Sequence, residues 1–330
     1  MSISQNNTLI CLTPVRNEAW ILPLFIMKAS EWADYIIIMD QCSTDGSREI
    51  ARSFEKVILI ENNDPTYDEA YRQKRLIDEA RKLPGERKVL FALDADEIIS
   101  LNWRYSKEWE IIMNARESSV LNFPWLTIID YEKSWRLPKR KSFAFVDDNK
   151  TSHSGDLIHS TRVPIPNMKH DVLNLEEIGI VHLKLLSKKR NRSKIRWYQA
   201  FERIKYPQKN AIDLFRTYNN HEAPRKEELV DNKLEWIVDI ENKNIIDHII
   251  EIDNDENLWW DNEVKELIEK YGTDYFKKID IWDLDFIPYK EINDPRSILD
   301  RMVHKWLIGT IKQRRAVLTR VIDKLLKKVW

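Results

Sequence analysis

Two aspartates, Asp94 and Asp96, follow a mainly apolar run from Lys88 to Leu93 that is typical of a strand. Because side chains alternate along an extended chain, these two carboxylates can point to the same side. Two carboxylates at this spacing can hold a divalent cation such as Mg²⁺, which completes its octahedron with phosphate oxygens and water. The pattern therefore predicts a metal-assisted diphosphate site, and its plain alternative is a solvated strand end.

Two apolar runs further upstream also end in compact polar residues. The segment Pro14-Val15-Arg16-Asn17-Glu18 follows the first run, and Asp40-Gln41-Cys42-Ser43-Thr44-Asp45 follows the second. Hydrogen-bonding groups of this kind can hold a nucleotide base and ribose. In open α/β sheets, ligands bind beyond the carboxyl ends of the strands. We therefore expect both segments and Asp94–Glu97 to form one shared site.

The elements that must position these residues alternate along the first hundred residues. Short apolar runs predict strands at Thr8–Leu12, Tyr35–Met39, Val57–Ile60 and Lys88–Leu93. Helical spacing predicts helices up to Trp32, at Ser47–Phe54 and at Tyr67–Leu83. This alternation is typical of a parallel sheet covered by helices. Later strands are expected at Ser119–Asp130, Phe143–Val146 and Ile178–Leu185, with a mainly helical chain from Ser187 onward.

The three strand-end motifs, in this order, resemble those of the family 2 glycosyltransferases. In that family the first strand ends in Pro-x-x-Asn-Glu, the second in an Asp-Asp-Gly-Ser-like loop and the fourth in Asp-x-Asp. The resemblance covers roughly residues 8–100 and continues more weakly to about 185. It implies a GT-A fold, a nucleotide-binding α/β sandwich with a mostly parallel central sheet, here followed by a C-terminal helical region. We expect a catalytic domain at 1–186 and a helical acceptor or membrane-proximal region at 187–330.

The resemblance also implies a reaction. Members of the family invert the anomeric centre while moving a sugar from a nucleotide-diphosphate donor, so we expect a hexosyltransferase-type enzyme of polysaccharide biosynthesis. The acceptor is expected to be a glycan or a lipid-linked molecule, and the cofactor Mg²⁺ or Mn²⁺. The implied nucleotide-sugar-binding residues are Pro14, Arg16, Asn17, Glu18, Asp40, Arg72 and Asp94, with Asp40 accepting a hydrogen bond from the base. The implied metal residues are Asp96, Asp94 and His182, the last similar to a strand histidine of some relatives.

This chemistry also needs a base that takes the proton from the acceptor hydroxyl. Subfamilies that look close to this chain often carry a Val-His-Glu-like motif, and Leu157-Ile158-His159-Ser160 lies in the matching place, with Ser where the carboxylate would stand. The identity of the base therefore stays open. Asp156 is the first candidate, and Asp148 and Asp147 follow it. The alternative for each is an ordinary charge on a surface loop.

Three positions depart from the family pattern and keep other functions open. Gln41 replaces the usual second Asp, Cys42 replaces the usual Gly, and Ser160 replaces the carboxylate. One alternative is a nucleotidyltransferase on a similar sheet, because a fold does not fix a function. The other is a noncatalytic nucleotide- or glycan-binding subunit.

Composition excludes several further classes. The chain has six glycines in 330 residues, against about 7% in average usage, so a glycine-rich phosphate loop is not expected. A net charge of −1 argues against nucleic acid as a partner of the whole surface. A hydrophobic content of 43% argues against disorder.

The C-terminal segment differs from the rest of the chain in charge. Arg296–Trp330 holds ten Lys or Arg against Asp300 and Asp323, with apolar residues at helical spacing. Such a helix either lies on an anionic membrane surface or packs its apolar stripe on the catalytic domain. The first seven residues lack a leader pattern, and no apolar run reaches the roughly 18 residues of a membrane span. We expect a cytoplasmic protein, peripheral at the inner face of the membrane under the first alternative.

Overall fold

The computed structural model describes residues 7–219, 224, 226–238, 244–247, 258–283 and 292–330. The chain divides into two compact units, one of residues 1–186 and 230–253 and one of residues 187–229 and 254–330. Residues 230–253, which were expected in the C-terminal helical region at 187–330, therefore belong to the first unit. The reason is apolar packing, because Trp236, Ile237 and Ile246 belong to the main core of that unit.

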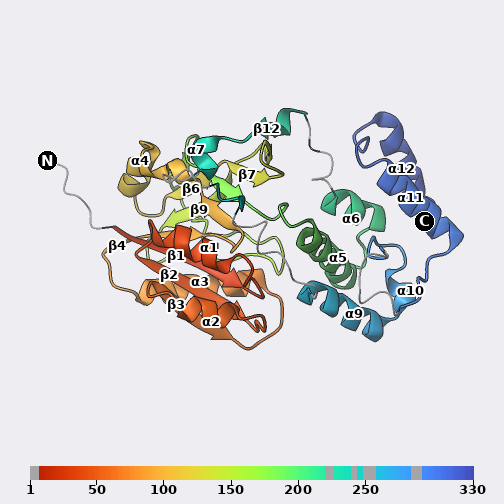
Figure 1. Ribbon diagram of the computed structural model, residues 1–330, viewed down its shortest axis with the longest axis horizontal. Helices are drawn as coiled ribbons and strands as arrows, with labels where there is room; N and C mark the ends of the chain where they lie inside the picture. The colour runs from red at the N-terminus through yellow and green to blue at the C-terminus, as the bar shows by residue number, and fades with distance from the viewer. Residues whose placement is uncertain (1–6, 220–223, 225, 239–243, 248–257, 284–291) are drawn as a thin grey trace. The chain divides into compact units, whose positions relative to one another are not determined.

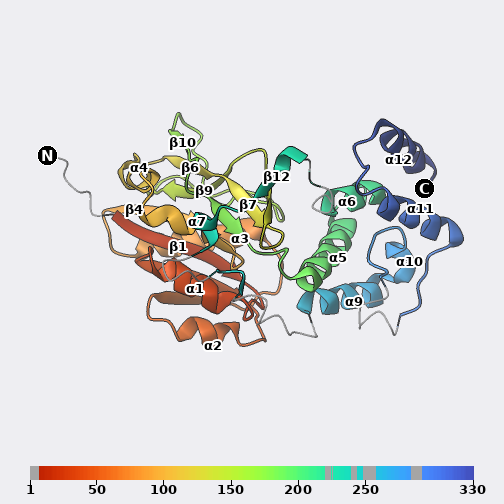
Figure 2. The same cartoon turned by 45° about the horizontal axis from the view of Figure 1, so that its top comes forward.

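A seven-stranded sheet with β1 (Asn7–Val15) near its middle forms the base of the first unit. β1 pairs in parallel with β2 (Tyr35–Gln41) and β4 (Arg87–Ala92), and β3 (Val57–Asn62) pairs in parallel with β2. β9 (Lys141–Val146) runs antiparallel to β4 and to β6 (Val120–Phe123), and β10 (Val172–Asn174) lies at the edge (Figure 2). This arrangement confirms the predicted α/β class with a mostly parallel central sheet.

Helices cover both faces of this sheet (Figure 1). Successive residues of β1 face opposite sides: Cys11 belongs to the same core as Phe25 of α1 (Leu22–Ser30), and Leu12 to the same core as Leu76 of α3 (Glu69–Lys82). α2 (Ser47–Arg52) lies between β2 and β3 in the sequence. The other described helices of the unit are α4 (Glu108–Asn114), α7 (Leu234–Ile237) and a 3₁₀ turn at Leu101–Arg104. The buried β-strands are thus apolar on both faces, as the continuous apolar runs predict.

A second, five-stranded sheet was not expected from the sequence. Its order is β12-β8-β7-β11-β5, with bounds Leu229–Asp231, Lys133–Arg136, Trp125–Ile128, Ile180–His182 and Glu97–Ile99. The single strand predicted at Ser119–Asp130 is wrong: Pro124 separates β6 from β7, and the two strands join different sheets. Proline lacks the N–H that a continuous ladder needs, while its carbonyl accepts a hydrogen bond from Ile180 N at 2.9 Å.

The second unit is helical, as the sequence predicts from Ser187 onward. Its helices are α5 (Lys188–Lys205), α6 (Ala211–Tyr218), α9 (Trp259–Tyr271), α10 (Thr273–Phe276), α11 (Ile298–Gly309) and α12 (Val317–Val329), with a 3₁₀ turn at Lys226–Glu228. A bidentate pair between Arg196 and Asp261, at 3.0 and 2.9 Å, joins α5 to α9. Among the described residues, no helix is both long and apolar enough to cross a membrane.

A substitution at Gly179, just before β11, tests how tightly Trp236 of α7 packs against this position. A Cβ built on Gly179 would lie 2.1 and 2.3 Å from the Cη2 and Cζ3 atoms of Trp236. We expect Gly179→Ala to lower the free energy of unfolding by about 1–3 kcal/mol through overpacking, measured by urea denaturation. Gly309→Ala is the matched control, because a Cβ at Gly309 meets nothing within 4 Å. Equal stability of the two variants would contradict the packing described.

Candidate functional site

The polar ends of β1, β2 and β4 lie at one edge of the seven-stranded sheet. Val15 at the end of β1 is in register with Asp40 of β2, and Leu12 is in register with Ala92 of β4. Leu93 N continues the ladder to Leu12 O at 3.1 Å. The residues that follow the three strands therefore emerge side by side, as predicted from strand direction.

The loops after β1 and β2 are tied together by four hydrogen bonds. Asn17 N donates to Ser43 Oγ at 2.8 Å, and Thr44 N donates to Asn17 Oδ1 at 2.7 Å. Glu18 N donates to Ser47 Oγ at 3.0 Å, and Ala19 N donates to Asp45 Oδ2 at 2.9 Å. Asn17 has a φ of 55°, in the left-handed region that asparagine tolerates better than most residues. The structure thus brings the first two predicted segments, with the partly buried Pro14, Arg16 and Glu18, into one rigid rim.

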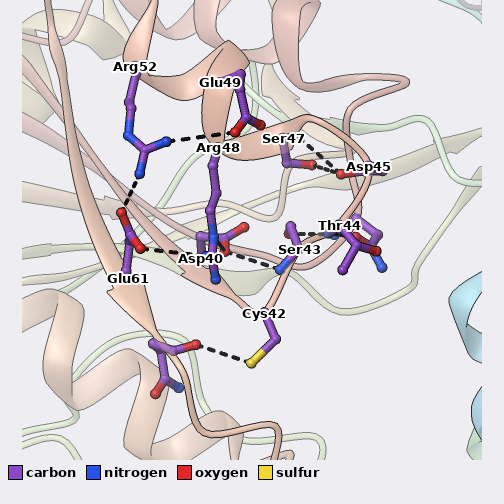
Figure 3. A network of polar contacts seen from close by, with 12 residues as sticks. Asp40, Cys42, Ser43, Thr44, Asp45, Ser47, Arg48, Glu49, Arg52 and Glu61 are labelled. Atoms are coloured by element: carbon purple, nitrogen blue, oxygen red, sulfur yellow. Dashed lines mark hydrogen bonds and ion pairs between the residues drawn. The ribbon is translucent and has the colours of Figure 1, made fainter.

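Asp40 is fully buried at this edge, and Figure 3 shows its partners. Its Oδ1 accepts hydrogen bonds from Ser43 N, at 3.2 Å, and from Arg48 Nε. Arg48 also lies 3.5 Å from Glu61 Oε2. Within the part of the chain that the structure describes, Asp40 Oδ2 is buried and has no hydrogen-bond partner. Because an unsatisfied buried acceptor costs free energy, this oxygen is suited to receive an N–H from a bound molecule.

Gln41, one of the departures from the family pattern, anchors the segment after β3. Its Nε2 donates to Asp64 O at 3.0 Å and to Thr66 O at 2.6 Å. Its Oε1 accepts a hydrogen bond from Arg72 Nη1 at 3.3 Å. Arg72 is buried, and its guanidinium carbon lies 4.4 Å from the centre of the Tyr67 ring. An amide at position 41 can donate and accept at once, which an aspartate cannot do.

The Asp94–Glu97 segment is a turn between two sheets, so the extended spacing assumed from the sequence is wrong here. β4 ends at Ala92, and Glu97 N donates back to Asp94 O at 2.9 Å. A turn is favoured because Glu97 begins β5, and its side chain accepts a hydrogen bond from Asp94 N at 2.9 Å. Asp94 and Asp96 consequently contact different partners.

Arg162 is the principal partner of this acidic turn, and sequence reasoning missed it. Its Nη2 donates to Asp94 Oδ2 at 2.7 Å, and its Nη1 donates to Glu97 Oε2 at 2.7 Å. Its guanidinium carbon also lies 5.0 Å from the centre of the Phe143 ring. The sequence holds one general signal for it, because three carboxylates within four residues need a cation nearby. Arg162 is the arginine of the long connection that follows β9.

Asp96, the third carboxylate of the acidic turn, contacts His182 of β11. His182 Nε2 lies 3.4 Å from Asp96 Oδ2, and His182 Nδ1 lies 3.3 Å from Thr127 Oγ1. The imidazole stacks on Trp125, with ring centres 4.8 Å apart. The structure therefore brings two of the predicted metal residues together, and the stacked tryptophan fixes the orientation of the imidazole.

The donor set is suited to a metal that arrives with a diphosphate. Among the described residues there is no group of three or more His, Cys, Asp or Glu arranged around a single metal position. Mg²⁺ often needs only one or two protein carboxylates, because substrate phosphates and water complete its shell. Asp96 and the partly exposed Asp94 can supply two. The residues present fit such a metal.

The three candidate bases have different surroundings. Asp147 is buried, and Arg81 donates to it three times at 2.8–3.2 Å. Burial alone would raise the pKa of Asp148, but hydrogen bonds from Thr151 and Ser118 outweigh it and hold the pKa well below its usual range. Asp156 is exposed. Asp147 and Asp148 are thus engaged in structural contacts, and Asp156 alone of the three is exposed.

The segment that carries Asp156 and Arg162 is fixed to the beginning of α3. Glu69 N donates to Leu157 O at 3.0 Å, and Ser160 N donates to Glu69 Oε2 at 2.9 Å. His159, between them, has a φ of 60°. The backbone of Ser160 thus meets a carboxylate supplied by another element, α3.

No protein-family model matches the chain, and no curated protein matches it. Among solved structures, it is similar to HddC from Yersinia pseudotuberculosis, with 11% identity and a TM-score of 0.30 over 53% of this chain and 92% of that one. It is also similar to the inositol-1-phosphate CTP transferase from T. maritima, with 10% identity and a TM-score of 0.30 over 55% and 89%. A third match, a mycobacterial protein, has 14% identity and a TM-score of 0.28, and this chain spans 42% of its length. Likenesses of this size give no information about the reaction.

The titration of Glu97 gives a test of the acidic turn. Burial raises the pKa of Glu97 to about 8 from an ordinary 4.5, with Asp94 and Asp96 adding to the effect and Arg162 opposing it. The folded chain therefore holds this proton more tightly than the unfolded chain, and the stability it contributes is complete below pH 4.5 and is lost as the pH rises through about 8. Between these values we expect the Tm of the native chain to fall relative to that of Glu97→Gln, in scanning calorimetry at stepped pH. Parallel curves would contradict the raised pKa.

Proposed function

We propose that this protein is an inverting glycosyltransferase that moves a sugar from a nucleotide-diphosphate donor to a glycan or lipid-linked acceptor. The proposal rests on two features at one sheet edge: a buried acceptor oxygen on Asp40, and an acidic turn whose Asp94 is paired with Arg162. The first feature is suited to the base of a nucleotide, and the second to its diphosphate. The order of the strand-end motifs supports the same proposal.

The nucleotide half of the donor is assigned to the rim formed by the loops after β1 and β2. Asp40 Oδ2 accepts an N–H of the base, while Pro14 and the 16–18 segment border the base and ribose. Arg72 supplies a buried guanidinium whose Nε has no hydrogen-bond partner among the described residues. Gln41 holds Arg72 and the segment after β3 in place, so the departure at position 41 changes the support of the pocket rather than removing it.

The diphosphate half is assigned to the acidic turn and the cations around it. Asp96 and Asp94 would hold Mg²⁺ or Mn²⁺, which would act as a Lewis acid on the diphosphate when bound. Arg162 provides a second positive group, fixed between Asp94 and Glu97. Lys141 provides a third. Its Nζ lies 4.2 Å from the centre of the Trp125 ring.

In the transfer itself, the acceptor oxygen forms a bond to the anomeric carbon while the bond from that carbon to the diphosphate oxygen breaks. The electron pair leaves with the diphosphate, where Arg162 and Lys141 stabilise the charge that develops. The acceptor proton passes to a base, for which Asp156 is the first choice because it is exposed and lies on the same segment as Arg162. We place the reaction in the cytoplasm, where a lipid-linked acceptor would be presented at the inner face of a membrane.

The reaction class can be tested with a panel of nucleotide sugars and acceptors in the presence of Mg²⁺ or Mn²⁺. We expect release of a nucleoside diphosphate, and a loss of about 10²-fold or more in turnover for Asp96→Asn, because a carboxylate at the diphosphate is lost. Asp274→Asn, on α10, is the control and should retain activity. Release of pyrophosphate from a nucleoside triphosphate would instead assign a nucleotidyltransferase. Donor binding without turnover over a broad acceptor panel would assign a noncatalytic subunit.

The role of Arg162 can be tested by donor binding alone. We expect Arg162→Gln to weaken binding of a nucleoside diphosphate about tenfold or more, since a charge-assisted contact is lost, and Arg162→Lys to weaken it less. Thermal shift with and without the nucleotide measures the effect, because a ligand stabilises the folded state it binds. Arg104→Gln, which removes a different ion pair, with Glu31, is the control. Unchanged affinity of Arg162→Gln would remove this residue from the site.

A further inference from the structure

The outer face of α12 carries large aliphatic side chains, and its inner face carries polar ones. Thr319 and Asp323 are only 4% and 7% exposed. The aliphatic residues of the same helix are between 50% and 77% exposed: Val317, Leu318, Val321, Leu325 and Val329. This is the reverse of the usual arrangement, in which a surface helix turns its apolar stripe to the core.

The exposed aliphatic residues form one continuous face. At 100° per residue, the five lie within an arc of about 120° around the helix axis. Thr319 and Asp323 lie on the opposite side, close to the direction of Leu326 and Trp330, which pack on the apolar cluster between α6 and α11. The outward face is therefore a coherent stripe rather than a scatter of single side chains.

Polar contacts fix this orientation. Arg216 of α6 donates to Asp323 at 2.8 and 3.0 Å, and Trp306 Nε1 of α11 donates to Asp323 Oδ1 at 3.0 Å. Rotating the helix to bury its aliphatic stripe would break these contacts and leave Arg216 half-buried without its carboxylate, which is costly. The second unit thus holds α12 with its apolar face outward.

The charges beside the stripe are all positive. Arg320, Lys324 and Lys328 are exposed and lie along one edge of the arc, and no ion pair engages them among the described residues. Asp323 is the one acidic residue of α12, and it faces inward. An apolar stripe with cations along its edge complements a surface that has an apolar interior and negative groups on its outside.

We propose that α12 docks on an anionic lipid surface, with its aliphatic stripe in the headgroup and acyl boundary and its cations among the lipid phosphates. A second copy of the chain is a poorer occupant, because the outward face of its α12 carries no carboxylate that could meet these cations. The inference does not depend on the proposed transferase activity and can fail or hold without it.

The test is co-sedimentation of the full chain with vesicles. We expect binding to vesicles of phosphatidylcholine with about one third phosphatidylglycerol, little binding to phosphatidylcholine alone, and a decline as salt is raised. The double variant Leu318→Asp/Leu325→Asp should bind about tenfold more weakly or worse. Lys324→Glu/Lys328→Glu should also bind about tenfold more weakly, because two attractive charges become repulsive.

The matched control is Leu234→Asp, since Leu234 is 67% exposed and Leu318 is 69% exposed, in different units. It should bind vesicles like the native chain. Circular dichroism and Tm must show that each variant is folded. We expect this result because the substituted residues are exposed. The proposal would be overturned if the native chain bound neutral and anionic vesicles equally. It would also be overturned if the α12 variants bound anionic vesicles as well as the control does. Sedimentation as a dimer that the Leu318→Asp/Leu325→Asp variant abolishes, together with no vesicle binding, would overturn it as well.

Discussion

The crowding of three carboxylates into four consecutive residues is the constraint on which the first unit depends. Glu97 is fully buried and Asp96 nearly so, and buried charge is tolerated only when it is paired or neutralised. Arg162 supplies the counter-charge from a distant part of the chain. For this contact to form, the connection after β9 must return across the sheet edge, and it is held there by Glu69 at the beginning of α3. Through Arg162, the irregular chain between β9 and β11 thus supplies the cation that the acidic turn needs.

The same balance governs how an anion can enter. Under the proposed function, a diphosphate that approaches Asp94 would bring more negative charge to a turn whose carboxylates already outnumber its arginine, so it would have to share Arg162 or arrive with a cation of its own. In this arrangement the arginine and a divalent ion are complementary. The rim that holds Asp40 is supported independently of this turn, through Arg48 and the hydrogen bonds between the two loops.

Much of the fold could be predicted from the sequence, because buried parallel strands are continuous apolar runs, and polar residues mark their ends. For this reason the positions of Asn17, Asp40 and Asp94 at one edge followed directly from strand direction. Arg162 could not be found in this way, because long-range ion pairs leave no local pattern. The split at Pro124 was missed because the residues on both sides are apolar, and apolar character alone does not say which sheet a strand joins. The orientation of α12 depends on the partners of Asp323, which periodicity does not reveal.

Along the described strands the chain passes from one sheet to the other five times, and the acidic turn before β5 and the single residue Pro124 are two of these passages. Asp40 therefore stands on one hydrogen-bonded platform, and His182 and Thr127 on another, with Asp94 and Asp96 at the seam. The backbone pairing of β1 with β2 lies wholly within the seven-stranded sheet. Under the proposed function, the two sides of the seam would hold different halves of the ligand, so one half can be exchanged during evolution while the binding of the other half is conserved.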